Sequence, residues 1–255
     1  MPNLDSWNTS ITEIANGVIK YRGSDIDGQI EAGELSGVLW QLLFATNPTI
    51  GQADALRRAL IAALDHGVAA PSTLTARAIA STRSSIPFAI AGGLIAFAGP
   101  AHGGAAEESA KLFIKVAGIS EGNLHDQVLS VVRPLLEKGE RIPGYGHPYH
   151  AYDPRVPALL RGVEDSSRHR EIAKEFESVV GELTGKKLSM NADSAVAALL
   201  LDVGLQPGDV TLITALGRSF GLAAHAREEQ ANEKPFRAPG LHTVFYDENI
   251  DLKGN

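Results

Sequence analysis

Two glycine-rich loops hold the histidines of this chain that are best placed for acid–base chemistry. His102 lies in the segment 98–104 (AGPAHGG), and His147 lies in the segment 141–148 (RIPGYGHP). Histidine accepts and donates protons near neutral pH, and glycines beside it let a ligand approach the backbone closely. An acidic pair after the first loop opens a predicted helix, whose free N–H groups would favour an anion or a developing oxyanion. Taken alone, each loop also fits an ordinary surface turn.

A carboxyl group and two arginines offer further charges for a site. Asp193 precedes a strongly apolar segment, 194–201, so it is either the N-cap of a helix or a general base with a shifted pKa. Arg155 follows the second histidine loop and could bind a carboxylate through paired N–H bonds. Arg218 lies inside an otherwise small and apolar helix, 212–226, where an arginine must extend to water or find a partner. These residue types suit a pocket for a small anionic ligand.

Other patterns are weaker or exclude whole classes of site. His66 ends an apolar helix, where a histidine is commonly satisfied by the helix end. His147 and His150 lack a fixed carboxylate partner, so we predict no metal site. The segment 181–187 (GELTGKK) is one residue short of a P-loop, and 144–146 lacks the third glycine of a dinucleotide fingerprint. The motifs of zinc proteases and serine hydrolases do not occur.

The composition limits the function further. The chain has 255 residues, of which 44% are hydrophobic and 21% charged, and its net charge is −7. This acidic balance argues against a nucleic-acid partner, which usually requires a basic surplus. No apolar run is long enough to cross a membrane, the polar N-terminus does not resemble a secretory signal, and cysteine is absent. We therefore expect a cytoplasmic protein with no membrane partner.

Helical periodicity dominates the chain, so the predicted fold is all-α. No segment alternates as a sheet strand does, and only 244–246 suggests a short strand. The segment 87–98 is small and apolar almost throughout and is expected to be a buried helix. We treat 1–255 as one domain and expect 118–204 to form a small lobe against the rest. The helices are predicted at 34–45, 53–64, 71–82, 87–98, 107–116, 123–137, 168–183, 194–203 and 211–230.

Several segments, taken in order, resemble the citrate synthase family over most of the chain. One such match would be weak evidence, but the shared order makes the resemblance specific. It implies a helical fold with a large and a small lobe and a site in the cleft between them. The matching segments are 21–26 (YRGSDI), 42–49 (LLFATNPT), 65–82 with its DH, Ser72, AR and AST elements, 99–108 (GPAHGGAAEE), 144–147 (GYGH), 152–155 (YDPR), 191–193 (NAD) and 217–225 (GRSFGLAAH).

The resemblance implies catalytic roles for three of these residues. Asp193 is similar to the carboxylate that removes a proton from the methyl group of an acetyl thioester. His102 is similar to the histidine that hydrogen-bonds the thioester oxygen as the enol forms. His147 is similar to the histidine that protonates the carbonyl of a 2-oxo acid. The chemistry is consistent, because protons next to a thioester are very weakly acidic and need a base and an enol-stabilising donor together.

Binding roles follow from the same resemblance. His66, Arg155 and Arg218 resemble the groups that hold the 2-oxo acid and its carboxylates. The loop Gly144, Tyr145 and Gly146 resembles part of a coenzyme A site, and Lys187 could meet a coenzyme A phosphate. Coenzyme A is then a substrate carrier, with no tightly bound cofactor. The partners are an acyl-CoA and a 2-oxo acid or their adduct, and the family implies a homodimer or a higher homo-oligomer.

Departures from the family pattern bear on the direction of the reaction. Only 51–64 separates the PT element from Asp65-His66, where the usual family has a long helical insertion. Short members with this gap include citryl-CoA lyase and the lyase portion of ATP-citrate lyase. Lys234-Pro235, with Arg237 nearby, replaces the family's Arg-Pro pair, and lysine is not equivalent to arginine for binding a carboxylate. We therefore predict cleavage of citryl-CoA or an analogue to acetyl-CoA and oxaloacetate. The alternatives are a compact citrate or 2-methylcitrate synthase and a non-catalytic acyl-CoA-binding relative.

Overall fold

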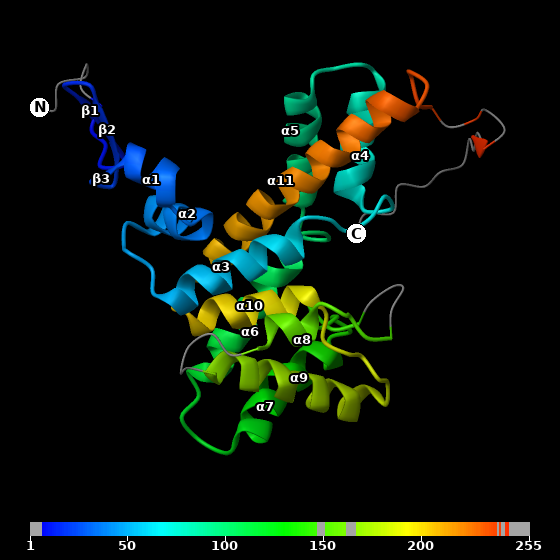
Figure 1. Ribbon diagram of the computed structural model, residues 1–255. Coiled ribbons are helices and arrows are strands. Elements are labelled where there is room, and N and C mark those ends of the chain that lie inside the picture. The colour runs from blue at the N-terminus through cyan, green and yellow to red at the C-terminus, as the bar shows by residue number, and fades with distance from the viewer. Residues whose placement is uncertain (1–6, 147–150, 162–166, 239, 241–242, 245–255) are drawn as a thin grey trace, which may run out of the picture.

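Helices make up most of the computed structural model, which describes residues 7–146, 151–161, 167–238, 240 and 243–244. The prediction of a mostly helical fold is confirmed, and each predicted long helix is present with its ends moved by a few residues (Figure 1). The short helices α1 and α8 were not predicted. The helices are α1 Ile26–Ala32, α2 Leu35–Phe44, α3 Ile50–Ala63, α4 Pro71–Ser81, α5 Ile86–Phe97, α6 Gly104–Ala117, α7 Leu124–Glu137, α8 Val156–Leu159, α9 Arg168–Thr184, α10 Ala192–Asp202 and α11 Pro207–Asn232.

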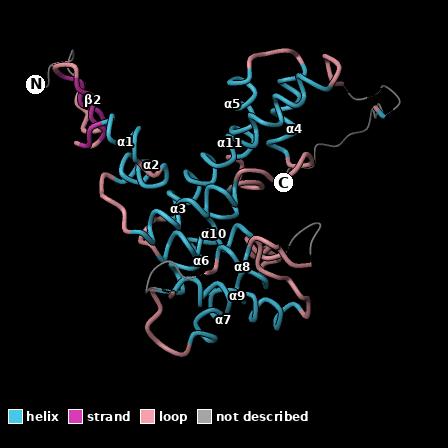
Figure 2. Tube along the Cα trace, in the orientation of Figure 1, coloured by secondary structure: helices cyan, strands magenta, loops and turns pink. Residues whose placement is uncertain are grey.

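A small antiparallel sheet lies ahead of α1, in a segment where no strand was predicted from the sequence (Figure 2). It consists of β1 Thr12–Ala15, β2 Val18–Tyr21 and β3 Ser24–Asp25. The turns Asn16-Gly17 and Arg22-Gly23 have positive φ at both residues, as two-residue hairpin turns of the primed type require. The Asn-Gly pair between short runs of β-branched residues was the signal that could have predicted this hairpin. The suggested strand at 244–246 lies largely outside the described residues.

The core of the molecule divides into two clusters of buried side chains. The larger cluster joins α2, α3 and α6 to α10 with the first turns of α11, around Phe113, Phe176 and Leu199. The smaller one, Ala76, Ala80, Ala89, Leu222 and Ala226, lies between α4, α5 and the later part of α11. Helix α11 therefore spans both clusters, as Figure 1 shows. The limits 118–204 of the small lobe stay a prediction.

Helix α5 is less buried than its composition led us to expect. Its buried residues are Ala89, Gly93 and Phe97, whereas Phe88 is 67% and Ile95 77% exposed in the single chain. Gly93 permits a close approach, because a Cβ there would lie 2.8 Å from the Leu222 side chain of α11. One face of α5 thus packs inside the chain and the opposite face is apolar and uncovered.

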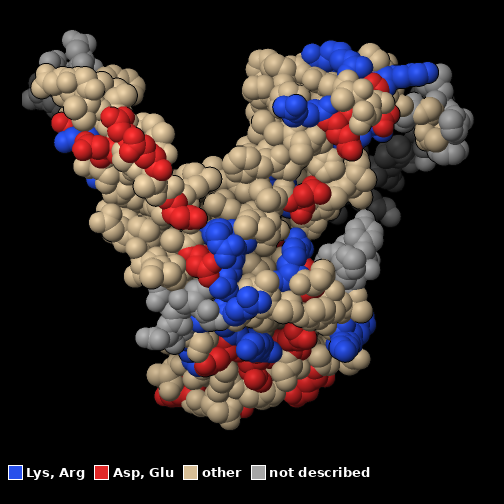
Figure 3. Space-filling model, in the orientation of Figure 1, with Lys and Arg blue, Asp and Glu red and all other residues tan. Residues whose placement is uncertain are grey.

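The surface carries its charges unevenly. In the view of Figure 3, acidic side chains gather along the arm formed by α1 and α2, and basic ones gather over the middle of the molecule near α3 and α10. On α3, Arg58 donates to the carbonyl groups of Ala158 and Arg161. None of the described helices is long and apolar enough to cross a membrane.

Candidate active site

One cleft collects residues from five separate stretches of the chain. It lies where the ends of α3 and α5, the starts of α6 and α10, and the middle of α11 meet. Of the residues that the sequence singled out, His66, His102, Arg155, Asp193 and Arg218 all line it. His147 lies outside the described residues. The other lining residues are Ala62, Ala63, Phe97, Gly103, Ala192, Val196 and Thr214.

Asp193 lies in the first turn of α10 and is not its N-cap. Asn191 is the N-cap, and its side-chain oxygen accepts a hydrogen bond of 2.9 Å from the Asp193 N–H. The Asp193 carboxyl is therefore not required for capping and faces the cleft. Burial raises its pKa to about 6, although the positive charges of Arg155 and Arg218 act in the opposite direction. A carboxyl group with this pKa can both donate and accept a proton near neutral pH.

Arg155 is held in place by Asp153, which is only 1% exposed. Nε and Nη2 of Arg155 donate to the two carboxylate oxygens of Asp153 at 3.0 and 2.7 Å, and Nη1 donates to the Ala62 carbonyl at 3.1 Å. Burial alone would raise the pKa of Asp153, but these hydrogen bonds and the charge of Arg155 lower it to about 2. The pair is therefore ionised, and the edge of the guanidinium that remains can face a ligand.

Arg218 extends from α11 into the cleft, and part of its guanidinium has no hydrogen-bond partner among the described residues. It is 2% exposed, and Nη2 is hydrogen-bonded to Nδ1 of His66 at 2.9 Å. Its guanidinium carbon lies 5.4 Å from the centre of the Phe97 ring, a cation–π arrangement. Among the described residues, Nε and Nη1 of Arg218 have no hydrogen-bond partner. Unpaired buried donors are costly, so this arginine is suited to an anionic ligand that would pair with them.

His102 is oriented by two contacts. Its Nε2 lies 2.8 Å from the hydroxyl of Ser72 on α4, and its ring packs edge-on against Phe97 with centres 5.1 Å apart. Burial, together with the charge of Arg218, lowers the pKa of His102, so the imidazole is neutral near pH 7. A neutral imidazole that accepts a hydrogen bond from Ser72 at Nε2 carries its proton on Nδ1 and can donate it to a ligand oxygen. Gly103 has no room for a side chain, because a Cβ there would lie 2.6 Å from the Phe97 ring.

The loop at Gly144–Gly146 is tied to the segment that leads into α10. The Gly144 carbonyl accepts from the Asn191 N–H at 2.9 Å, and the Gly146 carbonyl accepts from the Asn191 side chain at 3.0 Å. Gly144 has a φ of +80°, and a Cβ there would collide with Ser194. The loop and Asp193 are therefore positioned by the same asparagine.

The side chain of Tyr145 points away from any ligand at this loop. Its hydroxyl donates to the Ala173 carbonyl at 2.7 Å, and its ring stacks on Phe176. Only the backbone of Tyr145 is thus available for the predicted contact with coenzyme A.

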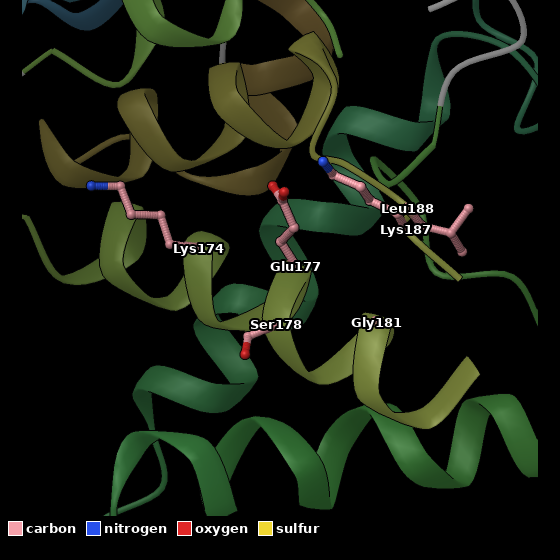
Figure 4. A pocket seen from close by; sticks show the side chains of 6 residues that line it. All are labelled: Lys174, Glu177, Ser178, Gly181, Lys187 and Leu188. Atoms are coloured by element: carbon pink, nitrogen blue, oxygen red, sulfur yellow. The ribbon is translucent and has the colours of Figure 1, made fainter. Parts of the chain in front are cut away.

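Lys187 lies on the rim of a second groove (Figure 4). Lys174, Glu177 and Ser178 line the groove from α9, and Leu188 lines it from the segment that follows Lys187. Figure 4 shows Glu177 between the two lysines. A Cβ on Gly146 would lie 3.5 Å from the Leu188 side chain, so this groove adjoins the glycine loop.

Three residues of the cleft region were not assigned a role from the sequence. Ser72 and Asp153 occur in the segments that carry the family resemblance, so their positions were visible and their contacts were not. Phe97 looked like one more apolar residue of a helix, and only the fold places its ring between His102 and Arg218. Within the described ranges, no cluster of three or more metal-ligating side chains occurs.

Comparisons with known proteins found a matching family and related sequences. The model of the family described as "Citrate synthase, C-terminal domain" matches residues 31–239. The citrate synthase of Saccharolobus solfataricus is 32% identical over 195 residues, which are 72% of this chain and 50% of that protein. The chain thus spans about half the length of that relative.

Two solved structures share the fold and part of the sequence. Citryl-CoA lyase from Hydrogenobacter thermophilus has a TM-score of 0.83 and 31% identity, and the match covers 98% of this chain and 97% of that chain. Citrate synthase from Thermoplasma acidophilum, solved as a ternary complex with carboxymethyl coenzyme A and oxaloacetate, has a TM-score of 0.71 and 25% identity over 87% of this chain and 59% of that one. The family match and these relatives establish that the chain belongs to the citrate synthase family.

Proposed function

We propose that this chain is an enzyme that cleaves citryl-CoA, or a close analogue, into acetyl-CoA and oxaloacetate. The observation that carries the proposal is a single cleft in which a carboxyl of raised pKa, Asp193, faces a neutral histidine, His102, and an arginine with unpaired donors, Arg218. This reaction needs an acid that protonates carbon, a hydrogen-bond donor to the enolate oxygen, and a cation that binds the substrate carboxylate.

The anchors for the carboxylates of the substrate are the two arginines. Nε and Nη1 of Arg218 would donate to one carboxylate, and the free edge of Arg155 would donate to another. His66, hydrogen-bonded to Arg218, would contact the same end of the substrate. Charge-assisted pairs of this kind fix orientation as well as supplying affinity.

Cleavage would begin with loss of the proton from the tertiary hydroxyl, for which the sequence assigns His147 as acceptor. The alkoxide electrons form the carbonyl of oxaloacetate while the adjacent C–C bond breaks and its electron pair enters the thioester enolate. Nδ1–H of His102 would stabilise the enolate oxygen, and the carboxylic acid of Asp193 would protonate the enolate carbon. The proton count closes, because one proton leaves the hydroxyl and one is added to carbon.

The coenzyme A portion of the substrate would run from this cleft past the glycine loop. The backbone of Gly144–Gly146 offers polar groups beside Asn191, and the groove with Lys174 and Lys187 lies next to it. The two ammonium groups suit the phosphates of coenzyme A. Coenzyme A would act as a carrier that enters and leaves with the substrate.

Three observations bear on whether the enzyme is a lyase or a synthase. Cleavage is favoured by the single helix α3 that links the segment before it to His66, and by the similar extent of this chain and the citryl-CoA lyase it matches. Condensation of acyl-CoA with a 2-oxo acid is favoured by the citrate synthases among its relatives. The same side chains serve either direction, so synthesis is the second candidate.

A homodimer or higher homo-oligomer is part of the proposal. The uncovered apolar face of α5, with Phe88 and Ile95, is the surface that supports it. Light scattering on the purified protein should give a mass of at least two chains. The cytoplasmic location continues to rest on the sequence alone.

The test is a pair of assays on the purified protein. One cuvette contains citryl-CoA, and release of oxaloacetate is followed with a coupled dehydrogenase. The other contains acetyl-CoA and oxaloacetate, and release of free coenzyme A is followed. Oxaloacetate from the first with no coenzyme A from the second supports the lyase, and free coenzyme A in the second supports the synthase. If the folded protein shows no activity in either assay, the lyase and the synthase are both rejected for these substrates.

A further inference from the structure

We propose that Asp153 is a positioning residue for this site, which fixes where the Asp193 carboxyl lies relative to the guanidinium of Arg155. The inference rests on the proposed function, because it assigns a role in that same reaction. Asp153 does not line the cleft and is 1% exposed, so it acts through its neighbours.

The contacts of Asp153 join two elements of the site. Its Oδ1 accepts from the backbone N–H and from Nε of Arg155, both at 3.0 Å. Its Oδ2 accepts from Nη2 of Arg155 at 2.7 Å and from the N–H of Ala192 at 2.9 Å. Ala192 is the first residue of α10 and directly precedes Asp193. One carboxylate thus holds the substrate-binding arginine and the start of the helix that carries the acid–base group.

This link also affects the charge state of Asp193. The carboxyl of Asp193 faces positive charges from Arg155 and from Arg218 of α11, and the negative charge of Asp153 opposes them. The cleft also contains the titratable rings of His66 and His102. By pairing with Arg155, Asp153 limits the attraction between that arginine and Asp193. Without it, Arg155 would be free to pair with Asp193, and the proton that cleavage requires would be lost at a lower pH.

The molecule contains a matched control away from the cleft. Asp202, at the end of α10, is also a buried carboxylate that holds an arginine and the start of a helix. Its Oδ2 accepts from Nε of Arg170 at 2.6 Å, and its Oδ1 accepts from the His169 N–H at 2.9 Å. Replacing Asp202 removes the same kind of ion pair without touching Arg155 or Asp193.

The experiment compares Asp153→Asn with Asp202→Asn, each checked for folding by circular dichroism, in the assay where the wild type is active. For Asp153→Asn we expect KM for the carboxylate substrate to rise about 10-fold and kcat to fall about 100-fold, because the arginine and the acid are displaced. The limb of the pH profile of kcat/KM that reports Asp193 should move about one unit lower. Asp202→Asn should leave KM and kcat within about twofold of the wild-type values and the pH limb in its wild-type position. A profile that Asp153→Asn does not move, with kinetics like those of Asp202→Asn, would overturn the inference.

A second variant covers the case in which Asp153→Asn does not fold. Asp153→Glu retains the charge but displaces the oxygens, so it should lower kcat about 10-fold and leave the pH limb in place. Wild-type kcat in Asp153→Glu would reject the positioning role. An inactive wild type would reject the proposed function and this inference with it, whereas an active wild type with unaltered Asp153 variants rejects the inference alone.

Discussion

Arg155 and Arg218 line the same cleft, and their hydrogen bonding differs. Arg155 is satisfied by Asp153 and by the Ala62 carbonyl, and its side chain is 29% exposed. Arg218 is 2% exposed, and among the described residues two of its nitrogens have no partner. Among the described residues, a carboxylate forms an ion pair with the more accessible arginine, whereas Asp65 and Asp193 act on the buried one only through their charges.

The difference indicates which side of the cleft is complete before a ligand binds. The Arg155 side forms an internally paired unit whose cost of burial is offset within the protein. The Arg218 side carries a cost that only a bound anion would offset, which is the local inconsistency expected of a functional site. Asp193 lines the same cleft, and the charges of both arginines lower its pKa, although burial outweighs them.

The largest effect on activity is expected when the Asp193 carboxyl, which interacts with both arginines, is replaced. Asp193→Asn deletes the acid that we propose protonates the enolate carbon, so kcat should fall by at least about 1000-fold in either direction of the reaction. Binding of an acyl-CoA, measured by calorimetry, should stay within a few-fold of wild type, because the variant keeps the shape of the side chain. Turnover at the wild-type rate would eliminate Asp193 from the mechanism.

Replacing each arginine in turn tests whether the two contribute to stability as differently as their hydrogen bonding indicates. Both Arg155→Met and Arg218→Met should raise KM for the carboxylate substrate, by about 100-fold, since each loses a charge-assisted contact. Their stabilities should move in opposite directions. Arg155→Met leaves the buried Asp153 carboxylate unpaired and should lower the free energy of unfolding by about 3 kcal/mol. Arg218→Met removes unpaired buried donors and should raise it by about 1 kcal/mol.

Urea unfolding of the two variants at pH 7 measures this difference directly. Equal losses of stability in both would show that Arg218 is as well satisfied in solution as Arg155. Binding of a dicarboxylate should then also fail to stabilise the wild type more than Arg218→Met.

Much of this arrangement could be predicted from the sequence, for physical reasons. Helix periodicity is a local signal, so the long helices were predicted almost to their ends. His102 and Gly144 stand in short segments whose glycines are needed for close packing, and such segments keep their residue types and order. The resemblance therefore brought His66, Arg155, Asp193 and Arg218 to one site before any contact was known.

What could not be predicted depends on contacts between distant segments. The pairing of Asp153 with the N–H of Ala192 joins residues 39 positions apart and has no local signature. Asp193 looked like an N-cap, and only the backbone shows that Asn191 fills that position. The composition of α5 predicted burial, but whether an apolar face is covered depends on neighbours that one sequence does not specify.

The two aspartates beside the arginines should respond oppositely to pH. The folded-state pKa of Asp193, about 6, lies above the ordinary value of 3.8, so its ionisation costs stability above pH 6 and costs nothing below about pH 4. Asp193→Asn should therefore be more stable than wild type at pH 7.5, by about 1–3 kcal/mol, with the gain fading by pH 4. The pKa of Asp153 is lowered to about 2, so its stabilisation is present above pH 4 and is lost only below that range. A gain from Asp193→Asn that is constant between pH 4 and 7.5 would contradict the raised pKa.

The smallest effect concerns the side-chain hydrogen bond between Ser72 and His102. Ser72→Ala removes the hydroxyl at Nε2 and should lower kcat about 10-fold, because the neutral ring loses the partner that selects its tautomer. The neighbouring Thr73 is equally buried, and its hydroxyl has no partner among the described residues, so Thr73→Val is the matched control. Thr73→Val should retain wild-type kcat and gain slightly in stability, since it removes an unsatisfied polar group. Equal kcat in Ser72→Ala and Thr73→Val would mean that packing against Phe97 orients His102 without help from the Ser72 hydroxyl.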